Sequence, residues 1–156
     1  MPKFDTGVNV EILRGWPGDG ALDQAMPIAA STTLSNGDVV VTQSDGITVA
    51  KVTTGATNGA VGLVIRGNGD TSLNVGSSVN SNKAVVLWSN YVARIKQAYV
   101  YKGSAVAIGD PLTAGGTNGL GIFRVGTPGT DPIIGYVIGI TAASTLNDAS
   151  YTILIR

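Results

Sequence analysis

Apolar and polar residues alternate along much of this chain. The clearest stretches are residues 8–12, 91–95 and 151–155, in which every second side chain is apolar. A period of two is typical of a β-strand with one buried face, whereas an amphipathic helix repeats near 3.6 residues. Val, Ile, Thr and Tyr dominate these stretches, which also favours strands. The pattern therefore predicts an all-β fold.

Turn-forming residues fall between the predicted strands. Ser44, Asp45 and Gly46 separate the runs VVVT and ITVAKV, which is the signature of a β-hairpin. Asn-Gly pairs, which tolerate positive φ, recur elsewhere along the chain. Many short strands separated by such turns predict an antiparallel barrel or sandwich.

The chain contains an internal repeat. The segment GDVVVTQSDGITVAKVTTGATNGAVGLVI from Gly37 resembles GDPLTAGGTNGLGIFRVGTPGTDPIIGYVI from Gly109, 72 residues later. At residues 45–46 and 118–119 the offset becomes 73, which predicts one additional residue at the second hairpin tip. The offset then stays at 73 for residues 51–52 with 124–125 and for residues 61–65 with 134–138.

The repeat predicts the domain organisation. We expect a single antiparallel β-barrel or sandwich over residues 27–156, built from similar halves at about residues 28–95 and 100–156. Residues 1–26 lie outside the repeat and are predicted to form an extended N-terminal arm. Residues 67–83 form a polar loop whose length suggests a role of its own or disorder.

The composition excludes several classes of chemistry. The 156-residue chain has no His and no Cys, so the usual zinc sites, a Ser-His-Asp triad and a Cys nucleophile are all excluded. Glu11 is the only Glu, and no pair of carboxylates stands out for acid–base work. We therefore expect no metal or cofactor, and a carboxylate-dependent hydrolase is the enzyme class that the composition leaves open.

Charge limits the partners. Ten Lys and Arg balance ten Asp and Glu, and only 13% of the residues are charged. No basic stripe is present, which argues against nucleic acid and against an anionic membrane surface. The longest apolar runs, IIGYVIGI and AVVLW, are too short to span a bilayer, and the first ten residues lack the apolar run of a signal peptide.

The segment GDPLTAGGTNG at residues 109–119 resembles a ligand-binding loop, but the repeat gives it another meaning. It lacks the late Glu of a calcium loop and the Lys of a phosphate loop. Asp38 occupies the same position in the first copy, so we expect both Asp residues to bond backbone N–H groups of their own turns. The predicted structural turn residues are Gly37, Asp38, Asp45, Gly46, Gly109, Asp110, Asn118 and Gly119.

Two functions remain open from the residues alone. Tyr91, Tyr99 and Tyr101 could form a stacking platform, which favours a carbohydrate-binding or adhesin-type β module as the alternative function. A carboxylate-dependent hydrolase would need two Asp residues to converge in a pocket, and the sequence indicates no such pair.

The pattern resembles the small β-barrel head-decoration, or structural cement, proteins of tailed bacteriophages. The resemblance lies in SNGDVVVTQSDGITVAKV, GAVGLVI, VAIGDPLTAGGTNGL, IIGYVIGI and the closing ASYTILIR, and it covers about residues 28–156. It implies a non-enzymatic protein on the outer surface of the virion capsid, made in the host cytoplasm. It also implies a homotrimer whose partner is the major capsid protein and which stabilises the head.

Within such a role we assign partner binding to the N-terminal arm. Residues 4–16 alternate apolar side chains yet lie outside the repeat, so they could add a strand to the edge of a neighbour's sheet. Deletion of residues 1–16 is then expected to abolish capsid binding or trimerisation and to leave a folded barrel. The predicted partner-binding residues are Phe4, Val8, Val10, Ile12, Leu13 and Trp16, the last of which could instead pack on its own barrel.

Overall fold

The protein is almost entirely β. The computed structural model describes residues 9–14, 25–53, 61–69, 82–117, 120–142 and 149–156, and this part of the chain contains no α-helix. The strands are β1 (Val10–Arg14), β2 (Ala25–Pro27), β3 (Val39–Thr42), β4 (Val49–Lys51), β5 (Val61–Arg66), β6 (Lys83–Leu87), β7 (Tyr91–Lys96), β8 (Val100–Tyr101), β9 (Pro111–Thr117), β10 (Leu120–Val125), β11 (Gly135–Thr141) and β12 (Ser150–Ile155), with a 3₁₀ turn η1 (Gln97–Tyr99).

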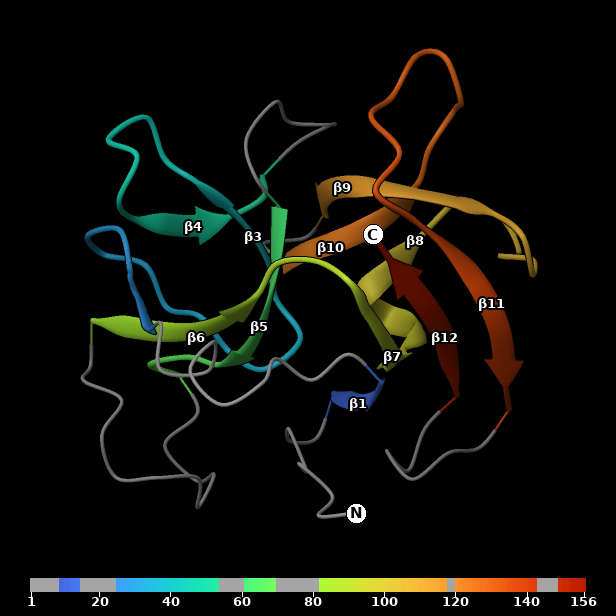
Figure 1. Ribbon diagram of the computed structural model, residues 1–156, viewed down its shortest axis with the longest axis horizontal. Helices are drawn as coiled ribbons and strands as arrows, with labels where there is room; N and C mark the ends of the chain where they lie inside the picture. Colours follow the sequence, from blue (N-terminus) through green and yellow to red (C-terminus); the bar gives the residue numbers. More distant parts are fainter. Residues whose placement is uncertain (1–8, 15–24, 54–60, 70–81, 118–119, 143–148) are drawn as a thin grey trace.

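The strands form two sheets (Figure 1). Sheet A has the order β1-β7-β12-β11-β9-β10-β8, and sheet B has the order β2-β6-β5-β3-β4. Neighbouring strands are antiparallel except for β8 and β10, which are parallel. The predicted all-β fold is confirmed, and the two-sheet arrangement makes it sandwich-like, since the described strands do not close into one barrel.

The two halves share one strand order. Sheet B runs β2-β6-β5-β3-β4, and the corresponding part of sheet A runs β7-β12-β11-β9-β10. The bulges coincide as well: pairing with the neighbouring strand shifts between Val64 and Arg66 in β5 and between Val137 and Gly139 in β11. The predicted construction from two similar halves is confirmed by strand order and by these shared irregularities.

The register corrects the length of the second hairpin. Val40 pairs with Lys51, and its counterpart Leu112 pairs with Val125. Lys51 therefore corresponds to Val125 rather than to Arg124, so the β9–β10 hairpin has two more residues than the β3–β4 hairpin, not one. The sequence comparison missed the second additional residue because the insertion lengthens strands β9 and β10 and is not confined to the hairpin tip.

The sheet order also moves the boundary between the halves. β7 runs beside β12 in sheet A as β2 runs beside β6 in sheet B. Residues 91–95, assigned above to the first half, therefore lie in the sheet of the second half, and β2 opens the first. The change of sheet falls at residues 88–90, where Asn90 takes a positive φ of 58°.

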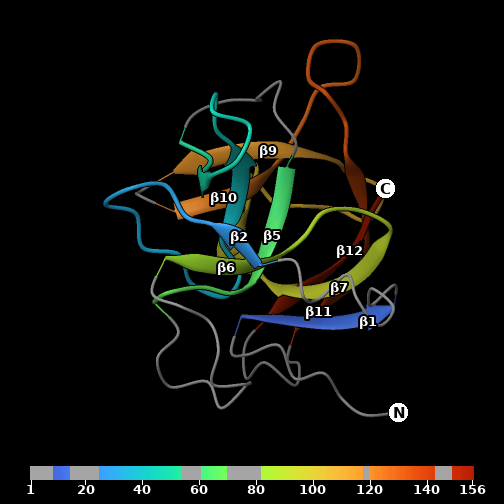
Figure 2. The ribbon, with the colours of Figure 1, turned by 60° about the vertical axis from the view of Figure 1, so that its left-hand side comes forward.

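β1 is the one described strand without a counterpart in the other half. It runs antiparallel to β7 along the outer edge of sheet A (Figure 2). The short β8 does have a counterpart, because Val100 bridges Phe123 as Ile28 bridges Val49, in both cases in parallel. β1 is thus an addition to the repeated unit.

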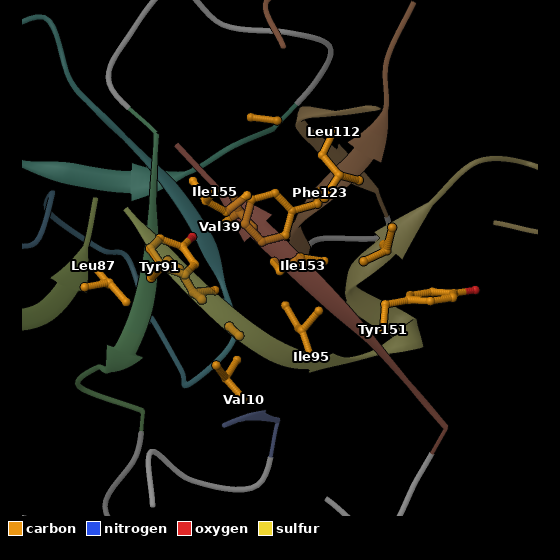
Figure 3. Close-up of a cluster of buried hydrophobic side chains, with 14 of the residues drawn as sticks. Val10, Val39, Leu87, Tyr91, Ile95, Leu112, Phe123, Tyr151, Ile153 and Ile155 are labelled. Atoms are coloured by element: carbon orange, nitrogen blue, oxygen red, sulfur yellow. The ribbon is translucent and has the colours of Figure 1, made fainter. Parts of the chain in front are cut away.

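The main core lies between the two sheets. Val39 and Leu87 of sheet B belong to this cluster together with Leu112, Phe123 and Ile153 of sheet A, all of which are labelled in Figure 3. Phe123 and Ile153 are fully buried, and burial raises the pKa of the Tyr91 hydroxyl well above its usual range. A second, smaller core covers the opposite face of sheet B and includes Ile28, Leu34, Val40, Val49, Val64, Ala84 and Val86.

Candidate partner-binding surface

β1 is attached to the body of the protein at its first described residue. The side-chain amide of Asn9 donates to the carbonyl oxygen of Asn36 at 2.8 Å, and the backbone N–H of Asn9 donates to Asn36 Oδ1 at 3.0 Å. Asn36 is fully buried, and its own amide donates to the carbonyl oxygen of Ile65 at 2.8 Å. The arm is therefore joined to the β3 turn of the other half, in addition to its pairing with β7.

The predicted partner-binding residues fall into two groups. Val10 is fully buried in the main core, and the half-buried Ile12 packs against the same cluster. Leu13, at 37% exposure, is the one member of the set that the structure describes on the surface. Phe4, Val8 and Trp16 lie outside the described residues. Of the predicted partner-binding residues that the structure describes, only Leu13 is therefore available to a partner without disturbing the chain's own core.

The Gly-Asp turns that precede β3 and β9 have the same hydrogen bonds. Asp38 Oδ2 accepts from the N–H of Ser35, and Asp110 Oδ2 accepts from the N–H of Ala107, each at 2.8 Å. Gly37 and Gly109 both take positive φ, at 99° and 93°. These two carboxylates organise their own turns, as expected of local backbone acceptors.

The two Gly-Asp turns differ in the distance from the Asp carboxylate to its nearest Lys. Lys102 Nζ lies 2.8 Å from Asp110 Oδ2, whereas Lys51 Nζ lies 3.6 Å from Asp38 Oδ2. The hydrogen bond from the Ala107 N–H, followed by that from Lys102, lowers the pKa of Asp110 below its usual value. Both carboxylates thus face a cation as well as a backbone donor.

The tip of the first hairpin is also held by its Asp. Asp45 Oδ1 accepts from the N–H groups of Ile47 and Thr48, and Asp45 Oδ2 accepts from the Thr48 hydroxyl. These bonds, the Ile47 N–H first, lower the pKa of the Asp45 carboxyl. Gly46 takes a positive φ of 70°, and the corresponding Asn118 and Gly119 lie outside the described residues.

The acidic side chains of the described residues do not form a metal-binding cluster. Three acidic side chains form ion pairs with Lys or Arg, including Glu11, which lies 2.9 Å from Arg94. Within the described ranges, no three carboxylates gather where they could hold a metal ion.

The three tyrosines do not form a common platform. Tyr91 is buried in the core, and Tyr99 is half-buried with its ring against the turn at Gly37. Only Tyr101, in β8, is substantially exposed, at 49%. Stacking on a sugar requires an exposed aromatic face. Of the three tyrosines proposed for a carbohydrate-binding module, Tyr91 and Tyr99 therefore do not offer such a face.

Sequence reasoning missed a set of exposed apolar side chains in the second half. Ile108, Ile138 and Ile140 are 65%, 45% and 46% exposed. The repeat contained the signal for two of them: Ile108 corresponds to Asn36, which the arm covers, and Ile138 corresponds to Ile65, which is buried. These two apolar residues are exposed at positions whose counterparts in the first half are covered within the molecule. They therefore indicate a surface that is available to another molecule.

The chain matches no protein-family model and shows no significant similarity to any curated protein sequence. Among the described residues, there is no helix with both the length and the apolar character needed to cross a membrane.

Proposed function

We propose that this protein is a capsid decoration, or structural cement, protein of a tailed bacteriophage. It binds the outer surface of the assembled head, contacts the major capsid protein and bridges neighbouring capsomers, acting as a homotrimer and not as an enzyme. The proposal rests on the motif resemblance of residues 28–156 and on a fold made of two similar halves.

The observation that carries the proposal is the additional strand β1. The repeated unit accounts for all the other described strands, so the fold of the unit does not require β1. β1 nevertheless is fastened by Asn9 to the opposite half and presents Leu13 and Arg14 to solvent. A fastened strand outside the repeated unit is suited to holding the chain's N-terminal segment at a fixed place on the surface.

The physical basis of cementing is linkage. A protein that binds the assembled shell but not its separate parts stabilises the shell by RT ln(1 + [L]/Kd) per site. A trimer that contacts several capsomers adds avidity, so each individual contact can remain weak. The absence of net charge and the low content of charged residues let neighbouring copies lie close together on the shell without strong repulsion.

Co-sedimentation with expanded heads tests the proposal. The heads should come from the phage whose genome carries this gene, and the protein should pellet with the heads but not with unassembled capsid subunits. The position of the bound protein would then be imaged on the outside of the shell. Failure of the full-length protein to pellet with intact heads would contradict the proposed function.

The structure changes the deletion that tests the arm. Deleting residues 1–16, as the sequence suggested, would remove Val10 from the core and the whole β1–β7 pairing. Deleting only residues 1–8 leaves Asn9 and β1 in place. We expect the shortened protein to unfold at the same temperature as the full chain. It should bind heads at least tenfold more weakly, because it lacks the binding energy of a few interface anchors.

A further inference from the structure

The two halves of the molecule turn opposite faces of their equivalent sheets toward the main core. In sheet B, the cross-strand row Val39, Leu63 and Leu87 faces the main core. The corresponding row of sheet A is Pro111, Tyr136 and Leu154, which pair across β9, β11 and β12 in the same register. This second row lies on the face of sheet A that points away from the core.

The other faces differ in the same way. Leu112, Phe123, Val137 and Ile153 of sheet A face the main core, whereas their counterparts in sheet B belong to the smaller core. Those counterparts are Val40, Val49, Val64 and Val86. One face of the first half therefore packs against the opposite face of the second half. The halves are arranged head to tail, and in the described part of the chain no second half packs against the face of sheet A that carries Pro111, Tyr136 and Leu154.

The unmatched face keeps apolar side chains. Val39, Leu63 and Leu87 are 0%, 0% and 4% exposed, whereas Pro111, Tyr136 and Leu154 are only half-buried. The difference is largest at the bulge, where Ile65 is 7% exposed and its counterpart Ile138 is 45% exposed. Val92 of β7 continues the row, because it pairs with Leu154.

We propose that this surface, the outer row of sheet A formed by Val92, Pro111, Tyr136, Ile138 and Leu154, binds a second copy of this chain. The equivalent surface of the first half is covered by a unit of the same fold, and another copy of the chain supplies such a unit. A contact of this head-to-tail type joins two different surfaces, and contacts of this kind close into rings when the rotation permits.

Charge on and around the surface does not oppose burial. Arg94 and Glu11, on the same face of neighbouring strands, form an ion pair at 2.9 Å. The guanidinium of Arg156 lies 5.7 Å from the ring centre of Tyr136, within reach of a cation–π interaction. The whole chain has a formal net charge of zero, so two copies approach without long-range repulsion. The proposal rests on the homotrimer of the proposed function, for which it names the contact surface, and it can be tested without a capsid.

Sedimentation velocity of the purified full-length chain over a wide concentration range tests the self-association. We expect species heavier than the 15.8 kDa monomer, with dissociation on dilution. Ile138→Lys should raise the dissociation constant about tenfold or more, as for a charge placed in an apolar contact. Ile140→Lys is the matched control: it is equally exposed on the same strand but pairs with Tyr151, on the side that faces the core. It should leave the dissociation constant unchanged.

A second measurement does not depend on how the lysine variants fold. The chain has no Cys, so Ile138→Cys introduces a unique thiol. Its rate of maleimide labelling should fall as the protein concentration rises, whereas Ile140→Cys should be labelled at the same rate throughout. A wild-type chain that stays monomeric at every concentration, or a thiol at 138 labelled independently of concentration, would overturn the proposal.

Discussion

Asp38 and Asp110 perform one structural task in two environments. Each accepts a backbone N–H three residues before it, and each follows a glycine of positive φ. Asp38 is 1% exposed, whereas Asp110 is only half-buried. Because water can replace a lost acceptor at a surface but not in a core, the same substitution has unequal costs at the two sites.

Replacing each carboxylate measures this difference. Asp38→Ala removes a buried acceptor from the part-buried N–H of Ser35 and should lower the free energy of unfolding by about 1–3 kcal/mol. Asp110→Ala should lower it by less than about 1 kcal/mol, since its bonds are partly solvated. Urea denaturation of the two variants beside the parent protein provides the comparison. Equal losses would show that burial is not what distinguishes the turns.

The depressed pKa of Asp110 predicts a dependence of stability on pH. A carboxyl whose pKa is lower in the folded state contributes stability above the unfolded pKa of about 3.9 and loses it as pH falls through the folded pKa. The parent protein should therefore exceed Asp110→Asn in stability near neutral pH, and the difference should disappear in acid. Thermal unfolding of both proteins across this range tests the sign, and a difference that does not vary with pH would refute it.

At the level of strands, the N-terminal strand depends on a few specific bonds. β1 is an edge strand, so only β7 supports it within the sheet. Asn9 adds two hydrogen bonds to Asn36, and Val10 adds burial. Edge strands with one neighbour open locally more easily than central strands, so these contacts determine how firmly the arm is held.

Weakening that attachment should loosen β1 alone. Asn9→Ala removes the side-chain bond to the Asn36 carbonyl, and the usual net value of one hydrogen bond corresponds to a roughly twofold to tenfold faster opening. Native-state hydrogen exchange should show this increase at the amides of Val10–Arg14. The amides of β12, in the centre of sheet A, serve as the internal control, and acceleration there as well would mean that the substitution destabilises the whole fold instead.

Local patterns in the sequence predicted most strands but not their partners. Period-two alternation identified β7 and β12, each of which has one buried face, and β1, whose Val10 and Ile12 pack in or against the main core. The three-residue β2 was missed, since alternation is not detectable over so short a run. β7 was placed in the wrong half because β6 and β7 are adjacent in sequence, and only the pairing registers reveal that the chain changes sheets between them.

At the scale of the whole molecule, the repeat explains both what was predicted and what was not. The sequence alignment predicted two similar halves, and the shared strand order confirms them. It could not predict that the halves pack head to tail, because two similar sequences predict similar strands but not which face of each sheet packs against the other half. The arm was the expected binding segment because it lies outside the repeat. In the structure, Val10 of the arm lies in the core, whereas Ile138 lies exposed on the outer row of sheet A.

The central claim is that this protein binds and stabilises an assembled shell. Calorimetry of expanded heads at increasing concentrations of the protein tests it most directly, because a ligand specific for the assembled state raises the temperature at which the shell comes apart. We predict a rise that saturates at full occupancy and corresponds to about 2.7 kcal/mol per site when the free concentration is a hundred times Kd. A disruption temperature that does not change with added protein would contradict the account.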